Sequence, residues 1–260
     1  MKLLLDIGNT NITIGIFDKG KWQHIWRLET KKDEPALYYS LKLNNLLWEA
    51  GINAGDIDYS VFSTVVPELK DVFSELLFKL NKKEPVILDR DIYSKLDIHI
   101  SNPFEIGSDL VANAVAAHHL YKDDIIIVDF GTALTFTVLD SDGTIAGINI
   151  APGVKTAIDA LVNNTSQLPK VELEFPLIPL GSNTVEAIQN GVLVGYIGLV
   201  KYMIKVIKNY KEKDYKTVTT GGLASLISPH LGEVDYLEPN LTLYGLLFAG
   251  EMLEKHNKES

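Results

Sequence analysis

Two segments of the chain place an aspartate, a glycine and a cluster of small polar residues directly after an apolar run. One is Leu3-Leu4-Leu5-Asp6-Ile7-Gly8-Asn9-Thr10-Asn11, and the other is Ile125-Ile126-Ile127-Val128-Asp129-Phe130-Gly131-Thr132. Each is followed by strand-like sequence, in residues 12–17 and 135–139. The pattern therefore predicts two β-hairpins of one design.

The turns of these hairpins carry residue types that bind phosphate. Glycine lacks a Cβ, so Gly8 and Gly131 can adopt positive φ and bring backbone N–H groups close to an anion. Short polar donors surround these glycines: Asn9, Thr10, Asn11 and Thr132. Asp6 and Asp129 stand at strand ends, where a carboxylate can hold a hydrated cation. Asp-x-Gly also occurs in ordinary turns, but two matched copies favour a phosphate site.

A third acidic residue, Asp109, follows Gly107 and Ser108 at the start of a segment that turns helical from Leu110. The helix dipole is expected to hold its carboxylate ionised. Two interpretations are open. Ser108 or Asp109 can serve as a helix cap, which the local sequence favours, or Asp109 is a general base that faces a bound nucleotide.

Paired glycines occur once between a strand and a helix, in Thr220-Gly221-Gly222-Leu223-Ala224. Such a pair lets a flat ligand, for example adenine with its ribose, lie against the backbone. Gly-Gly also ends strands without any functional role. The six histidines show no His-x-x-x-His spacing, so neither a metal site nor a catalytic triad is indicated.

Composition limits the class of protein. The chain has 260 residues, 46% of them hydrophobic, no cysteine and a formal net charge of −10. Disulfides and thiolate chemistry are excluded, and the charge disfavours nucleic acid or an anionic membrane as partner. No basic leader precedes the first strand, and the apolar segment 191–207 carries Lys201 and Lys205 and is expected to be too short for a membrane span. We expect a cytoplasmic protein.

The order of predicted elements repeats along the chain. Strands at 3–7, 12–17 and 22–29 precede a helix at 37–51, a strand at 59–66, a helix at 69–80 and a strand at 86–88. After a helix from residue 110, strands at 125–129, 135–139 and 144–150 repeat the opening, followed by helices at 154–162 and 182–207, a strand at 216–219 and a closing helix at 239–253. Gly191, Gly195 and Gly198 suggest close approach of a neighbouring helix or a second subunit. An α/β protein with two similar lobes is predicted.

Five motifs, in this order and spacing, resemble those of the type III pantothenate kinases. They are residues 6–11, Gly107-Ser108-Asp109, Asp129-Phe130-Gly131-Thr132-Ala133, Ala151-Pro152-Gly153 and Thr220-Gly221-Gly222-Leu223-Ala224. The resemblance covers essentially the whole chain. It implies the actin-like (ribonuclease H-like) fold of sugar kinases, acetate kinase and heat-shock chaperone ATPases. In that fold each lobe is a mixed sheet that opens with three antiparallel strands and is flanked by helices. The lobes would be residues 1–106 and 107–260, with the nucleotide in the cleft between them.

The resemblance also implies a reaction, ATP-dependent phosphorylation of pantothenate as the first step of coenzyme A synthesis, with Mg²⁺ and with K⁺ or NH₄⁺. Asp109 would be the catalytic proton acceptor, and Asp129 would bind the monovalent cation. ATP would contact Asp6, Ile7, Gly8, Asn9, Thr10, Asn11, Ile12, Thr13 and Thr132. Pantothenate would contact Gly107, Ser108, Asp109, Leu110 and Thr184, the last from the partner subunit of a homodimer.

Two positions depart from the family pattern, both on the acceptor side. The residue after the proposed base is commonly Arg in that motif and is Leu110 in this chain, and Ile100 stands where an aromatic is frequent. Leucine cannot pair with an anion. Two alternatives to pantothenate phosphorylation therefore stay open: a nucleotide-binding regulatory homologue without kinase activity, and a kinase of the same fold that acts on another small alcohol.

Overall fold

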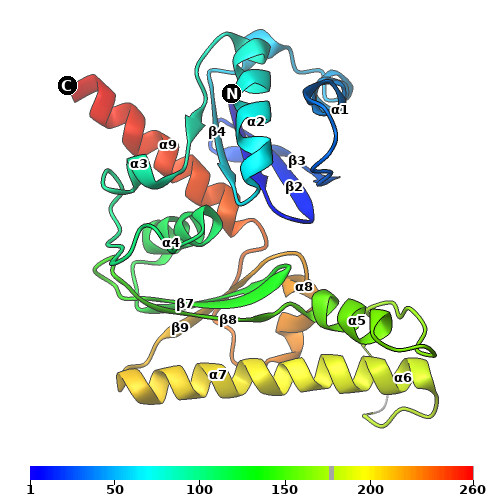
Figure 1. Cartoon of the computed structure of the whole chain (residues 1–260). Helices are drawn as coiled ribbons and strands as arrows, with labels where there is room; N and C mark the ends of the chain where they lie inside the picture. Colours follow the sequence, from blue (N-terminus) through cyan, green and yellow to red (C-terminus); the bar gives the residue numbers. More distant parts are fainter. Residues whose placement is uncertain (176–178, 260) are drawn as a thin grey trace. The chain divides into compact units, whose positions relative to one another are not determined.

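The computed structural model describes residues 1–175 and 179–259. Contacts within the chain define two compact units, one of Met1–Tyr121 with Leu241–Ser260 and one of Lys122–Asn240 (Figure 1). The sequence places the lobe boundary between residues 106 and 107. The compact units divide the chain differently, because the helix that begins at Ser108 packs on the C-terminal helix within the first unit.

The first unit is built on a five-stranded mixed sheet with the order β3-β2-β1-β4-β5. Its strands are β1 (Lys2–Ile7), β2 (Asn11–Asp18), β3 (Lys21–Glu29), β4 (Tyr59–Thr64) and β5 (Val86–Ile87). The first three are antiparallel, while β4 runs parallel to β1 and β5 parallel to β4. In this register Asp6 lies opposite Thr13 on one side and Ser63 on the other.

Helices cover both faces of this sheet. On one face α1 (Ala36–Glu49) and α2 (Pro67–Asn81) bury Leu43, Leu47, Phe73 and Leu77 against the strands. On the other, α9 (Leu241–Glu259) packs on β1 and β4, and α4 (Ser108–Tyr121) packs on α9. Gly245 makes that helix pair possible, because a Cβ there would overlap the backbone of Ala112. The close crossing fixes α4, and with it Asp109, relative to the sheet.

The second unit repeats this design with the sheet order β10-β9-β6-β7-β8. Its strands are β6 (Ile125–Phe130), β7 (Ala133–Leu139), β8 (Ile145–Pro152), β9 (Lys216–Thr220) and β10 (Tyr236–Leu237). Strand β6 is antiparallel to β7 and parallel to β9, as β1 is to β2 and β4. The predicted duplication of an α/β unit that opens with three antiparallel strands is confirmed.

A long helical segment lies along the second sheet (Figure 1). It comprises α6 (Thr184–Gln189), a π-helical segment (Asn190–Val194) and α7 (Gly195–Lys211), and Leu193, Val200 and Ile207 enter the core. Three shorter elements complete the unit: α5 (Val154–Asn163), α8 (Ala224–Ile227) and a 3₁₀ turn at Ser228–His230. Small elements of the first unit are α3 (Arg90–Tyr93) and a 3₁₀ turn at Ala54–Asp56.

Two expectations about this long helix need correction. The expectation of a segment too short for a membrane is wrong on length, since the helix of residues 184–211 is long and apolar enough to cross one. That is weak evidence, because core helices of soluble proteins pass the same test. Second, open space lies where a Cβ would stand on Gly191, Gly195 and Gly198, so no helix of the described residues makes the predicted close approach, and the alternative, a second subunit, stays a prediction.

Candidate functional site

The first hairpin turn, between β1 and β2, is closed by backbone and side-chain hydrogen bonds. The Gly8 N–H donates to the Asn11 carbonyl at 3.0 Å. Thr30, just after β3, donates its N–H to the Thr10 carbonyl at 2.9 Å and its hydroxyl to the Gly8 carbonyl at 2.7 Å. These bonds occupy carbonyl oxygens of the turn, and the side chains of Asn9, Thr10 and Asn11 remain exposed.

Two side chains from distant positions contact this turn and strand end. Ser63, the neighbour of Asp6 in the parallel pairing, donates its hydroxyl to Asp6 Oδ1 at 3.0 Å. Lys32 Nζ donates to Asn9 Oδ1 at 3.2 Å. The sequence interpretation did not include Thr30, Lys32 or Ser63. Ser63 was within reach of a sequence argument, because β4 runs parallel to β1 in register, whereas the path of Lys32 depends on loop geometry.

Gly8 and Gly131 do not use the positive φ that is open to glycine, because neither is among the positive-φ residues of the described chain. Glycine at position 8 is instead required by space, since a Cβ would stand only 3.1 Å from the Asn11 carbonyl oxygen. At Gly131 a Cβ would lie 3.4 Å from the Ala133 carbonyl oxygen, which is an ordinary contact. The two turns therefore use their glycines differently.

Asp109 lies in the first turn of α4, in the same unit as the first hairpin. Its Oδ1 accepts the N–H of Leu110 at 2.9 Å, and the Ser108 hydroxyl donates to the Thr64 carbonyl at 3.2 Å. A Cβ on Gly107 would stand only 2.5 Å from Asp109 Oδ1. The Gly-x-Asp spacing thus leaves room for the carboxylate to fold back over the chain that precedes it.

Burial raises the pKa of Asp109 above its ordinary value, although backbone N–H groups act in the opposite direction. The predicted effect of the helix terminus is therefore outweighed by desolvation. A carboxylate with a raised pKa is a stronger base, which is the property a proton acceptor needs. The next side chain, Leu110, is 7% exposed and points away from solvent, so it offers no charge to a ligand.

The second hairpin turn, between β6 and β7, is held by the segment that begins with Ala151-Pro152-Gly153. The Gly131 N–H donates to the Ala133 carbonyl at 3.1 Å. The Thr132 carbonyl accepts the Gly153 N–H at 3.0 Å and the Thr156 hydroxyl at 2.7 Å. A Cβ on Gly153 would overlap the carbonyl oxygens of Gly131 and Thr132. This third glycine therefore serves the turn by close packing.

Gly221 reaches the same strand end from β9. Its φ is +91°, and a Cβ there would overlap Asp129 Oδ1 and the backbone of Phe130. The Leu223 N–H also donates to the Phe130 carbonyl at 3.4 Å. Three motifs that are widely separated in the sequence, around Asp129, Gly153 and Gly221, thus meet at one place in the second unit.

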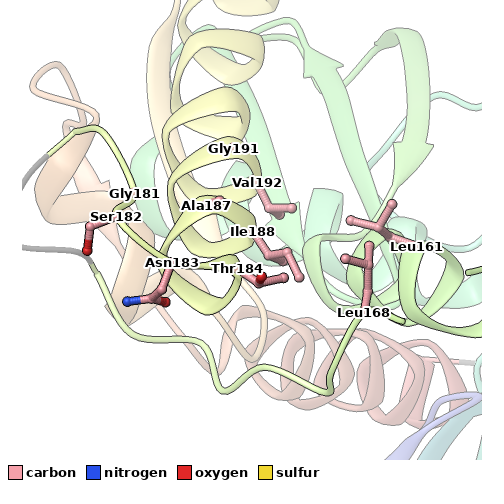
Figure 2. Close-up of a pocket in the computed structure, with 10 residues that line it drawn as sticks. All are labelled: Leu161, Leu168, Gly181, Ser182, Asn183, Thr184, Ala187, Ile188, Gly191 and Val192. Atoms are coloured by element: carbon pink, nitrogen blue, oxygen red, sulfur yellow. The ribbon is translucent and has the colours of Figure 1, made fainter. Parts of the chain in front are cut away.

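Thr184 lies apart from this cluster, at the start of α6, where it lines a pocket of about 510 Å³. In Figure 2 the side chains of Ile188 and Val192 point toward Leu161 and Leu168 across the pocket, while Ser182 and Asn183 point the other way. The pocket wall is therefore mainly apolar near Thr184. No other predicted site residue of the described chain lines it.

The residues available for cations are oxygen donors. Among the described residues no three His, Cys, Asp or Glu side chains gather into a metal-binding group. Mg²⁺ usually binds to one or two carboxylates together with substrate phosphates and waters, so a dedicated protein cage is not required. The carboxylates of Asp6 and Asp129 at strand ends fit that mode, and an all-oxygen environment also suits a hard monovalent cation.

Comparison with protein families gives one match, a family model described as type III pantothenate kinase, over residues 2–206. The chain is similar over nearly its full length to several solved structures. One is a protein from Campylobacter jejuni described as a Baf family transcriptional activator, with 17% identity, coverage of 98% of this chain and 99% of that one, and a TM-score of 0.58.

Two further structures share the fold at lower identity. A protein from Sinorhizobium meliloti described as a 2-dehydro-3-deoxygalactonokinase has 11% identity, coverage of 97% and 99%, and a TM-score of 0.59. The activator of 2-hydroxyisocaproyl-CoA dehydratase from Clostridium difficile, solved with bound ADPNP, has 12% identity, coverage of 99% and 97%, and a TM-score of 0.52. These likenesses confirm the predicted actin-like fold.

Proposed function

The chain belongs to the type III pantothenate kinase family, and we propose that its two hairpin turns bind ATP while Asp109 activates the acceptor hydroxyl. The reaction is ATP-dependent phosphorylation of pantothenate to 4'-phosphopantothenate, the first step of coenzyme A synthesis. The observation that carries the residue assignment is the pair of turns of matched topology, each with a carboxylate at the end of the preceding strand.

For the nucleotide we propose contacts with residues 6–13 and with Thr132. The carbonyl oxygens of both turns already accept hydrogen bonds from Thr30, Gly153 and Thr156. The side chains of Asn9, Thr10 and Asn11 are exposed and polar, which suits contact with the phosphates. Lys32, held at Asn9, adds a positive charge beside the first turn, which offsets the net negative charge of the chain.

Asp109 is proposed as the general base. It would orient the acceptor hydroxyl and take its proton as the phosphoryl group is transferred, a contribution of about 10²–10⁴-fold in rate. Its raised pKa brings the carboxylate closer to the pH at which the enzyme works. The geometry that supports this role is the space above Gly107 into which the carboxylate folds.

Two cations complete the proposal. Mg²⁺ would neutralise charge on the transferred phosphoryl group when bound with ATP, and Asp6 is the carboxylate of the first turn that would help to hold it. Asp129 would hold K⁺ or NH₄⁺ at the second turn. Gly221 and Phe130 position that carboxylate by close packing.

For the acceptor we propose contacts with residues 107–110 and with Thr184, the latter contributed by the partner subunit of a homodimer. Thr184 lines a pocket that no other proposed site residue of the described chain lines, and this supports a separate role for it. We further propose that the dimer acts in the cytoplasm.

One feature favours a second candidate function. Leu110, buried and uncharged, stands where the family motif commonly has Arg, which would suit a nucleotide-binding regulator that has lost catalysis or a kinase for an uncharged alcohol. Asp109 and its supporting Gly107 are both retained, and this favours catalysis over binding alone.

An acceptor panel distinguishes these functions. We expect pantothenate to stimulate ADP release by the purified chain in the presence of Mg²⁺ and K⁺, more strongly than other small alcohols and sugars at equal concentration. A coupled assay of ADP release measures the rate, and mass spectrometry identifies the phosphorylated product. If only another alcohol stimulates ADP release, that alcohol is the acceptor. If no tested compound stimulates ADP release, the regulatory function is favoured.

A further inference from the structure

Pantothenate is a carboxylate, and the chain carries a net charge of −10. An anionic acceptor therefore needs a local cation, and the residue next to the proposed base cannot supply one, because Leu110 is an apolar side chain that is only 7% exposed. Another element of the unit that holds Asp109 offers such a cation. The inference below rests on the proposed function.

Arg90 is one of only two arginines in the chain and opens the short helix α3. Its guanidinium carbon lies 5.0 Å from the centroid of the Phe104 ring. Phe104 is 76% exposed and belongs to the loop that leads into Gly107 and Asp109. A guanidinium stacked on an exposed ring is held in place without being neutralised.

Of the two carboxylates next to Arg90 in sequence, that of Asp89 is already engaged. Asp89 caps α3 by accepting the Asp91 N–H at Oδ1, 3.1 Å away, and pairs through Oδ2 with Lys70 Nζ at 2.8 Å. Within residues 1–175 and 179–259 Arg90 forms no ion pair. Its charge is therefore available to a ligand, whereas that of Lys70 is not.

Tyr93 connects Arg90 to the proposed base. The phenol, 5% exposed, lies on the same short helix, and burial raises its pKa to about 12, with further increases from the carboxylates of Asp89 and Asp109. Arg90 lowers the same pKa. The buried hydroxyl of Tyr93 is thus within electrostatic range of both Asp109 and Arg90. The guanidinium of Arg90, on α3, therefore lies in the neighbourhood of the proposed base on α4.

The placement of Arg90 and Asp109 on different elements matches the chemistry of the acceptor. The hydroxyl that receives phosphate and the carboxylate lie at opposite ends of pantothenate, so the group that binds the carboxylate must be separated from the base. We propose that Arg90, held over Phe104, pairs with the carboxylate of the acceptor and determines the preference for an acidic substrate. Its planar fork can form two parallel hydrogen bonds with a carboxylate, which Lys95 on the following turn cannot.

The test compares pantothenate with pantothenol, in which an alcohol replaces the carboxylate. Arg90→Ala is expected to lower kcat/KM for pantothenate about ten- to hundredfold, the size of one charge-assisted hydrogen bond pair. It should leave kcat/KM for pantothenol and KM for ATP nearly unchanged. Arg90→Lys should recover part of the loss, because charge returns without the fork.

Two further variants serve as controls. Lys95→Ala removes the same charge from an exposed position five residues away and should keep the wild-type preference. Phe104→Leu removes the ring under the guanidinium and should lower the preference for pantothenate by less than Arg90→Ala does.

The outcomes separate this inference from the function on which it rests. If the wild type phosphorylates pantothenate and Arg90→Ala keeps the same preference over pantothenol, Arg90 does not read the carboxylate and the pantothenate assignment stands. Equal losses with both substrates would also overturn the inference, because they indicate a structural role. A wild type that phosphorylates neither compound overturns the proposed function and the inference together.

Discussion

The two hairpin turns of this chain share one topology and are reinforced in different ways. In the first unit, hydroxyl groups hold the turn and its aspartate: Thr30 bonds to Gly8, and Ser63 bonds to Asp6. In the second unit, Thr156 bonds to Thr132, but the aspartate is packed by a glycine backbone, that of Gly221. Duplication preserved the strand order, while the local means of fixing each carboxylate diverged.

This difference predicts unequal tolerance to substitution. A hydrogen bond from a hydroxyl contributes about 1 kcal/mol and can be lost without displacing its neighbours. A Cβ introduced at Gly153 or Gly221 would overlap the turn itself. The second turn should therefore be the less tolerant of the two.

A second asymmetry concerns the helix that follows each sheet. After β5 the chain passes through the short helix α3 and then enters α4, whose first turn contains Asp109, whereas after β10 it enters α9, whose first turn has no acidic residue. The proposed base thus occurs in only one of the two related positions. The duplicated fold supplies two glycine-bearing turns but places an acidic residue in the first turn of only one of these two helices.

Removing that acceptor should give the largest effect. Asp109→Asn is expected to lower kcat about 10²–10⁴-fold with little change in ATP affinity. Wild-type kcat/KM should fall as pH decreases through a pKa that lies above the ordinary value for Asp, because the protonated group cannot act as a base. Steady-state kinetics and calorimetric titration with an ATP analogue measure these quantities.

Although Asp109→Asn should lower kcat, it should not lower the free energy of unfolding at neutral pH. Because the folded-state pKa is raised, the group stabilises the fold below its unfolded pKa, and this contribution is lost as pH rises through the folded pKa. At neutral pH the asparagine variant should therefore unfold at equal or higher urea concentration. Asp91→Asn, an exposed acid in the first turn of α3, is the control. A variant with wild-type kcat would leave Asp109 as a helix cap only.

Gly221→Ala tests the packing of the second turn. The positive φ and the overlap with Asp129 and Phe130 should together lower the free energy of unfolding by about 2–4 kcal/mol. Gly147→Ala, on β8 of the same unit with open space at its Cβ position, should change stability little. Urea unfolding of both variants measures the difference in the free energy of unfolding. Equal midpoints would mean that close packing at Gly221 does not make the second turn less tolerant than the first.

Lys32→Ala tests the first turn and should have the smallest effect. We expect KM for ATP to rise about three- to fivefold, the size of an exposed charge contact. The neighbouring Lys31 has its Nζ over the Tyr38 ring, 5.5 Å from the centroid, so Lys31→Ala is the matched control. Equal changes in KM for ATP in the two variants would mean that the contact of Lys32 with Asn9 does not contribute to nucleotide binding.

Most of the fold could be predicted because its strands and helices are long and periodic. The hairpins at Asp6 and Asp129 and the covering helices were all recognisable from apolar patterns. The short elements α3 and β10 were missed because so short a segment carries no period, although the two-residue strand β5 was predicted. The π-helical segment at residues 190–194 has no distinct sequence signature either.

The site was predictable where a motif is local and not where it depends on packing. Gly8, Asp109 and Asp129 stand out by spacing alone, but Gly8 does not use positive φ, and its constraint is the space near Asn11. The dipole argument for Asp109 omitted burial, which dominates its pKa. The contact of Lys32 depends on the path of its loop and cannot be read from residue types, whereas the contact of Ser63 follows once the parallel register of β4 and β1 is known.

The claim that both turns serve one nucleotide is tested most directly by binding stoichiometry. Calorimetric titration with a non-hydrolysable ATP analogue and Mg²⁺ should give one site per chain in the wild type. Asp6→Asn and Asp129→Asn should each weaken that same site by about tenfold or more, because each removes a charge that organises cations or donors around the phosphates. Unchanged affinity in either variant, or two sites per chain of which each variant removes one, would contradict the claim.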